Sequence, residues 1–250
     1  MSKLRIQKFL AEAGLASRRA AEEMVAEGRV SVNGEQVRVL PVFVDPESDR
    51  VIVDGRVVRR RKKKVLYYLL NKPRGVVCTS DDPRGRRKAV DLVPATPGSR
   101  VYCVGRLDMD SSGVIILTND GELTDYITHP RYGVPATYVV ETIGVLSPED
   151  MESFKRGIYL DGKRTSRSGL RVIRRTHTSS IIEVTLREGR NREIRRMLLK
   201  FGVKVRRLRR TAIGPITDRG LKIGNWRNLT DWEIKKLRGA GSDPYEKKKS

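Results

Sequence analysis

The sequence predicts an α/β protein in which a small basic module precedes one larger domain. From Val65 to about residue 240, apolar runs of strand length alternate with turns and with segments of helical period, and no internal repeat occurs. The chain has 250 residues, of which 38% are hydrophobic, so it can form a large domain with a small companion. We therefore expect two globular units.

The balance of charge predicts a polyanionic partner. The chain carries 52 Lys and Arg residues against 30 Asp and Glu residues, which gives a formal net charge of +22. Such a field attracts nucleic acid. The alternatives are solubility alone and an anionic membrane surface, but no basic amphipathic helix stands alone in the sequence. We expect a nucleic-acid partner and no membrane.

Cysteine content and the amino-terminal sequence indicate the compartment. Cys78 and Cys103 are too few for a disulfide framework and have no second ligand pair for zinc. The run MSKLRIQKFLAEAG has no apolar segment of signal length, and no stretch approaches the roughly 18 apolar residues of a membrane helix. We expect a cytoplasmic protein.

The first 60 residues are predicted to form the small module. Four apolar residues at i, i+3, i+4 and i+7 predict a short helix with one buried face, namely Ile6, Phe9, Leu10 and Ala13. Ser17 is a suitable N-cap for a second helix that ends at Gly28. Alternating residues then turn at Asn33-Gly34 and at Asp54-Gly55, two strong hairpin signals.

Charge runs mark the boundaries of the larger domain. Residues 59–64 are six consecutive cations, and we expect a basic linker over 61–64. The large domain then covers 65–240, and the basic residues 241–250 are expected to be a disordered tail. Within the domain, Ser147-Pro148 and Thr230-Asp231-Trp232-Glu233 are predicted to begin helices.

A polar loop between two predicted strands holds the first candidate for chemistry. Val101 to Val104 and Val114 to Leu117 are expected to be short buried strands, so Asp108 falls on the connection between them. Rigid strands hold loops of this kind, where catalytic groups collect. Asp and Gly are also ordinary turn residues, and spacing alone favours a structural role for Asp108.

The amino-terminal module resembles a known RNA-binding domain. The run RIQKFLAEAGLASRRAAEEMVAEGRVSVNG is similar to the alpha-L domain, named after a protein of the small ribosomal subunit. In that family, basic residues of the helices and of the turn between them contact RNA phosphates, a mode that gives affinity with little sequence reading. The residues that the resemblance assigns to this role are Arg5, Lys8, Arg18, Arg19 and Arg29.

The larger domain resembles the pseudouridine synthases, specifically their RsuA/RluB branch. The matching segments are NKPRGVVCTSDDPRGRRKAVDLVP, VGRLDMDSSGVIILTNDG, REGRNREIRRMLLKFG and VRRLRRTAIGPI. The resemblance implies a monomer that isomerises one uridine of ribosomal RNA without a metal ion or an organic cofactor. It also implies a mixed, largely antiparallel central sheet, whereas the sequence pattern alone supports only the α/β class.

The resemblance also assigns the site residues. Asp108 would be the catalytic carboxylate, Arg190 its ion-pair partner, and Tyr138 the ring that stacks on the target uracil; Asp110 would have a supporting role at most. The family usually has Lys two positions before this Tyr, whereas this chain has Ala136. Further RNA contacts are expected from Arg106, Arg192, Arg195 and Arg196.

The choice of RNA is the least determined part of the prediction. REGRNREIRRM and the basic carboxyl end favour large-subunit (23S) rRNA, and small-subunit (16S) rRNA remains an alternative. A non-catalytic RNA-binding factor in ribosome assembly is the alternative from another class. An exchange of Asp108 for Asn separates the enzyme from such a factor.

Overall fold

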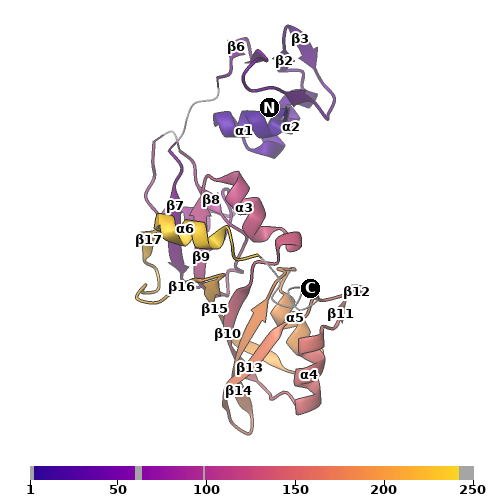
Figure 1. Cartoon of the computed structure of the whole chain (residues 1–250), viewed down its shortest axis with the longest axis vertical. Helices are drawn as coiled ribbons and strands as arrows, with labels where there is room; N and C mark the ends of the chain where they lie inside the picture. The colour runs from indigo at the N-terminus through magenta and orange to yellow at the C-terminus, as the bar shows by residue number, and fades with distance from the viewer. Residues whose placement is uncertain (1–2, 60–63, 98, 242–250) are drawn as a thin grey trace. The chain divides into compact units, whose positions relative to one another are not determined.

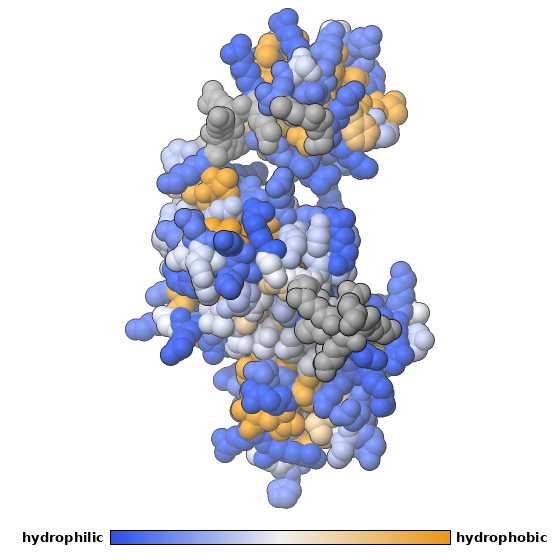
Figure 2. Space-filling model, viewed as in Figure 1, coloured by the Kyte–Doolittle hydropathy of each residue, from blue (hydrophilic) through white to orange (hydrophobic). Residues whose placement is uncertain are grey.

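The computed structural model describes residues 3–59, 64–97 and 99–241, and the chain divides into two compact units (Figure 1). Residues 1–64 and 96–100 belong to the first unit, and residues 65–95 and 101–250 belong to the second. Residues 61–63 of the expected linker and 242–250 of the expected tail fall outside the described residues. Hydrophilic residues cover most of the surface seen in Figure 2.

The first unit packs two helices against a small sheet. Both helices have the predicted bounds within two residues, and Ser17 caps the second helix by accepting a hydrogen bond from the amide of Ala20. Asn33 and Asp54 adopt the left-handed backbone that the predicted two-residue turns require. The elements are α1 (Ile6–Ala13), α2 (Arg18–Ala26), β1 (Leu4–Arg5), β2 (Val30–Val32), β3 (Glu35–Val37), β4 (Phe43–Val44), β5 (Val51–Val53) and β6 (Arg56–Val57).

In the described part of the second unit, nine strands form one sheet in which only β9 and β15 pair in parallel. The strand order is β13-β14-β10-β15-β9-β7-β17, with β16 beside β15 and β8 beside β9. The strands are β7 (Tyr67–Lys72), β8 (Tyr102–Cys103), β9 (Ser112–Thr118), β10 (Ala136–Ile143), β13 (Gly169–Arg175), β14 (Ser179–Leu186), β15 (Lys204–Ile213), β16 (Ile216–Thr217) and β17 (Trp226–Asn228). The sheet is therefore mixed and largely antiparallel, as expected.

Helices cover opposite faces of the two halves of this sheet. Helices α4 and α5 share a core with β10, β14 and β15, whereas α3 and α6 share a core with β7 and β9. Capping boxes at Ser147 and Thr230 begin α4 and α6, as predicted. The bounds are α3 (Gly121–Thr128), α4 (Pro148–Arg156), α5 (Glu193–Leu199) and α6 (Asp231–Leu237), with 3-10 turns at Ala89–Leu92 and Pro130–Tyr132 and a separate hairpin of β11 (Tyr159–Leu160) and β12 (Lys163–Arg164).

The alternation of β9 defines the side of the sheet on which the site lies. Val114 and Ile116 pack towards α3 and α6, whereas Ile115 and Leu117 face the other way. Tyr138 packs against the core of Ile115 and also against the core that α4 and α5 cover. These two cores therefore lie on the same side of the sheet, which we call the α5 face.

Candidate active site

Asp108 lies in the loop between β8 and β9, and this loop is held at several points. Leu107 is buried, and its amide donates to the Cys78 Sγ at 3.4 Å. The amide of Gly75 donates to the carbonyl oxygen of Met109 at 2.8 Å. The Asp108 side chain is 31% exposed, so a carboxylate on a fixed loop faces a partly open space.

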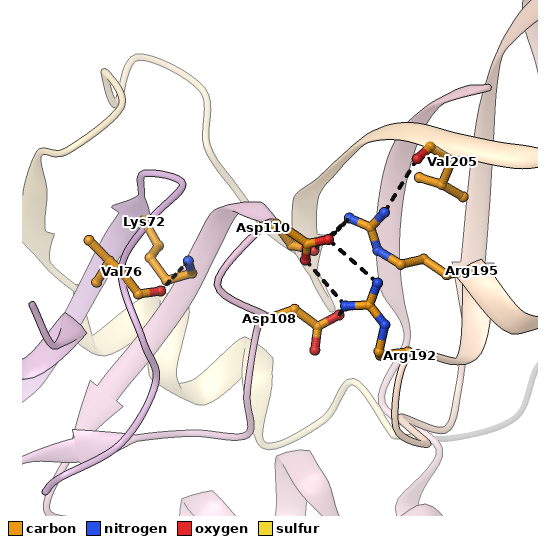
Figure 3. Close-up of polar contacts among 8 residues, drawn as sticks. Lys72, Val76, Asp108, Asp110, Arg192, Arg195 and Val205 are labelled. Atoms are coloured by element: carbon orange, nitrogen blue, oxygen red, sulfur yellow. Dashed lines mark hydrogen bonds and ion pairs between the residues drawn. The ribbon is translucent and has the colours of Figure 1, made fainter. Parts of the chain in front are cut away.

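Two arginines face Asp108 and its neighbour Asp110 (Figure 3). Arg192 Nη1 lies 3.3 Å from Asp108 Oδ2 and 3.4 Å from Asp110 Oδ1. Arg195 Nη2 lies 3.0 Å from Asp110 Oδ2. Arg192 therefore bridges the two carboxylates, and Arg195 holds the second one, so that both side chains are oriented.

The start of α5 places both arginines at this loop. Arg192 is the N-cap residue with φ of 49°, and Arg195 follows within the first turn. Arg195 Nη1 donates to the carbonyl oxygen of Val205 at 3.4 Å, and its side chain is only 13% exposed. Burial lowers the pKa of Arg195, and the charge of Asp110 opposes that shift. The spacing of three residues is the sequence signal that could have identified this pair.

Strand register brings a second set of residues into one row on the α5 face. Tyr138 pairs with Arg210, Arg210 with Gly113, and Gly113 with Lys72. Gly113 has φ of 111°, and a Cβ there would lie 2.6 Å from the Arg210 backbone nitrogen and closer still to its carbonyl oxygen. Only glycine allows β9 and β15 to approach this closely.

Two buried cations belong to this row. Lys72 is fully buried, and its ammonium donates to the carbonyl oxygens of Val76 at 2.8 Å and Pro73 at 3.0 Å. Burial lowers the pKa of Lys72, while neighbouring thiols and the carboxylates of the Asp108 loop oppose this. Arg210 is 6% exposed, and its Nε donates to the carbonyl oxygen of Val114 at 2.7 Å. Sequence reasoning missed both cations because the register of distant strands creates the row.

The prediction that Arg190 pairs with Asp108 is wrong. Arg190 Nε lies 3.0 Å from Glu188 Oε2, and its two terminal nitrogens donate to the carbonyl oxygens of Lys163 and Arg164 at 3.1 and 2.7 Å. The guanidinium is thus turned to the β11–β12 hairpin. The backbone enters the left-handed region only two residues later, where it presents Arg192 to Asp108 instead.

Glu193, beside this turn, is a buried carboxyl group. It is 4% exposed, its Oε2 accepts from the amide of Arg190 at 2.9 Å, and within the described residues its Oε1 has no hydrogen-bond partner. Burial, and then the charge of Glu188, raise the pKa of Glu193 to about 7.

Replacing Glu193 with Gln is expected to change the pH dependence of stability. The folded protein keeps the Glu193 proton to higher pH than the unfolded chain does, so protonation of Glu193 stabilises the folded state. This contribution to the free energy of unfolding is complete below pH about 4.5 and is lost as the pH rises through 7. At pH 8 we expect Glu193→Gln to exceed the wild type by about 2 kcal/mol in free energy of unfolding, with no such gain at pH 4.5. Urea unfolding at both pH values measures the difference, and an equal pH dependence of the two proteins would contradict it.

The other predicted RNA contacts are distributed over both units. In the second unit Arg106 is exposed, and Arg196 is paired with Asp161 at 2.5 Å. In the first unit Arg5, Arg18 and Arg19 are exposed, and Lys8 lies 3.8 Å from Glu12. Arg29 is already engaged, because Asp54 accepts two hydrogen bonds from its guanidinium, at 2.9 and 2.6 Å. None of these pairs tests RNA contact, so the assignments stay predictions.

The chain is similar to known proteins over almost its whole length. The model of the RNA pseudouridylate synthase family matches residues 66–200, and the S4 domain model matches residues 4–46. An uncharacterized RNA pseudouridine synthase of Aquifex aeolicus is 43% identical over 238 residues, which cover 95% of this chain and 94% of that protein. Ribosomal large subunit pseudouridine synthase B of Bacillus subtilis is 42% identical over 94% of this chain and 95% of its own length. A crystal structure of a pseudouridylate synthase aligns with a TM-score of 0.67 at 30% identity, over 94% of this chain and 99% of that one.

Proposed function

Because the chain belongs to the RNA pseudouridylate synthase family, we propose that it isomerises a uridine of large-subunit ribosomal RNA with Asp108 as the catalytic carboxylate. The expected fold and the S4-type domain are confirmed by the same comparisons. Large-subunit RNA is favoured over small-subunit RNA because relatives from Bacillus subtilis and Vibrio cholerae are named ribosomal large subunit pseudouridine synthase B. The observation that carries the role of Asp108 is its position on a fixed loop opposite Arg192.

The reaction needs a charged carboxylate at the sugar. The bond between the ribose C1′ and uracil N1 breaks, the base rotates, and C5 bonds to C1′. The proton on C5 then leaves and N1 takes up a proton, so the product is an isomer of the uridine. Asp108 can serve this sequence by attacking the sugar or by removing a sugar proton so that the base departs, and both routes require the ionised form. The ion pair with Arg192 holds the Asp108 carboxylate in a fixed direction.

Tyr138 is proposed to hold the base during its rotation. A uridine within folded RNA must be flipped out before an enzyme can reach its sugar bond, and aromatic rings hold such bases by stacking. Tyr138 is half-buried on β10 at one end of the row that contains Lys72 and Arg210. This position supports stacking because the ring is backed by two apolar cores.

The basic S4-type domain is proposed to hold the RNA while the second unit acts on it. Its exposed cations suit phosphate contacts, which fix position without reading bases. No helix within the described residues is long and apolar enough to cross a membrane. We propose a monomer that meets rRNA or a ribosomal-subunit precursor in the cytoplasm.

A pair of arginine variants is expected to separate catalysis from folding. Arg192→Met removes the partner of Asp108, so we expect kcat to fall about tenfold with little change in stability, since this pair is half-exposed. Arg190→Met removes contacts to two carbonyl oxygens and to Glu188, so we expect a loss of about 1–2 kcal/mol of stability and a near-normal rate at low temperature. Single-turnover rates and thermal unfolding of both variants measure this. A larger rate loss in Arg190→Met than in Arg192→Met would instead support Arg190 as the partner of Asp108.

Mapping of pseudouridines tests the function as a whole. Both ribosomal RNAs would be mapped at nucleotide resolution in cells with the wild-type gene, with a deletion, and with Asp108→Asn. We expect one large-subunit position to be lost in both mutants. Loss of a small-subunit position would change the substrate, and unchanged maps would support a binding role in ribosome assembly instead.

A further inference from the structure

Trp226 opens the edge strand β17 on the same side of the sheet as Asp108. It pairs in register with Leu70 of β7, so the two side chains lie on one face. Leu70 and Tyr68 belong to the core on the α5 face, as does Leu107, the residue before Asp108. The rings of Tyr68 and Trp226 meet edge to face, with centroids 5.3 Å apart and planes at 82°.

The segment before Trp226 is fastened to the strand that carries Lys72. Asn71 is fully buried, and its side chain donates to the carbonyl oxygen of Leu221 at 2.7 Å. The backbone of Asn71 exchanges two further hydrogen bonds with this segment, donating to Asn225 at 2.9 Å and accepting from Gly224 at 2.7 Å. The indole is therefore presented on a fixed frame, although 38% of its surface remains exposed.

The register gives the place of Trp226 relative to the site. Its partner Leu70 lies two residues from Lys72, so Trp226 is about 8 Å from Lys72 between backbones. Tyr138 is three strand spacings beyond Lys72 in the row already described, which puts it roughly 20 Å from Trp226. A few nucleotides of extended single strand span that distance.

We propose that Trp226 is a stacking platform for an unpaired base that lies a few nucleotides from the target uridine in the RNA. The inference rests on the proposed function, because it takes the RNA that enters the site as the occupant. An exposed, rigidly held indole beside an active site is suited to stacking, and bases stack whatever their identity. Two exposed cations could contact the adjoining phosphates. Lys222 lies four residues before Trp226 in the sequence, and Arg74 lies two residues after Lys72, at the end of β7.

The second tryptophan of the chain provides a matched control. The chain has two Trp residues, and Trp232 is 63% exposed on α6, with the ammonium of Lys236 5.5 Å from its ring centroid. Helix α6 packs through Ile234 and Leu237 on the side of the sheet opposite the α5 face. Trp232 is thus as exposed as a stacking residue would be, but it lies away from Asp108.

Fluorescence can report stacking on each indole separately. Trp232→Phe leaves Trp226 as the one tryptophan, Trp226→Phe leaves Trp232, and excitation at the red edge of the indole absorption band avoids the tyrosines. We expect a short oligouridylate to quench Trp226 and inorganic polyphosphate to leave it unchanged, because only the former carries bases. Emission from Trp232 should respond to neither. No quenching of Trp226, or equal quenching by polyphosphate, would overturn the proposal.

Kinetics on a large-subunit rRNA transcript give the second test. Trp226→Ala should raise KM about tenfold with kcat changed by less than about twofold, Trp226→Phe should restore KM, and Trp232→Ala should match the wild type. An unchanged KM in Trp226→Ala, or the same loss in Trp226→Phe, would count against stacking, and thermal unfolding checks that each variant is folded. If the wild-type protein forms no pseudouridine, the proposed function fails, and the fluorescence result still decides whether Trp226 meets bases.

Discussion

Asp108→Asn is expected to reduce the rate of pseudouridine formation at least about 10³-fold while RNA binding stays within about threefold of wild type. Asn keeps the shape of Asp but has no charge, so it can neither attack the sugar nor accept a proton from it. The loop should stay in place, because Leu107 remains buried and Asp110 still pairs with Arg192 and Arg195. Single-turnover assays and filter binding with the same transcript measure the two quantities.

Asp110→Asn is the matched control for this loss. Asp110 carries a charge two residues away and shares Arg192 with Asp108, but its role is to hold the arginines. We expect a fall of about tenfold, far smaller than that of Asp108→Asn. A variant Asp108→Asn with wild-type turnover would refute the catalytic assignment, and abolished activity in Asp110→Asn alone would transfer it to Asp110.

Gly113→Ala is expected to be the most damaging small substitution in the second unit. The added Cβ would clash with the backbone of Arg210, and φ of 111° is unfavourable for any residue with a side chain. Neither backbone can retreat without separating β9 from β15, so we expect a loss of about 3 kcal/mol or more of folding free energy. Urea unfolding and the yield of folded protein measure it.

Gly162→Ala isolates the backbone part of this effect. Gly162 also has a positive φ, of 73°, but a Cβ there would have no atom within 4 Å. Its substitution should cost only about 1 kcal/mol. Equal losses in the two variants would mean that the contact with Arg210 contributes nothing, and that the close approach of β9 and β15 tolerates a methyl group.

Local signals in the sequence were sufficient to predict where several helices begin. Ser17, Ser147 and Thr230 each begin a helix because a side-chain oxygen there satisfies free backbone amides, an effect that depends on neighbouring residues alone. Ile194, Met197 and Leu198 of α5 are buried at helical spacing, and Phe201 packs against the same core from beyond the end of the helix.

The arrangement of the site could be predicted only in part. The position of Asp108 between two strands follows from apolar runs on either side. The choice between Arg190 and Arg192 depends on one left-handed residue and on carbonyl oxygens of a hairpin 26 and 27 residues away in sequence, and no local pattern encodes either. The row through Lys72 and Arg210 needs the register of four strands, which periodicity does not provide.

The pairing of β17 with β7 has a consequence for synthesis of the protein. The hydrogen bond from Asn71 to Leu221 joins residues 150 apart in the sequence. During translation β7 is therefore made first of the strands in this sheet, but it can pair with β17 only after β17, the last strand, has been made. On a growing chain the outer edge of β7 therefore offers unpaired backbone groups to other chains after the strands of the active-site row have all been made. Translation must therefore continue past β17, which ends at Asn228, before the edge of β7 is covered and the risk of association with other chains passes.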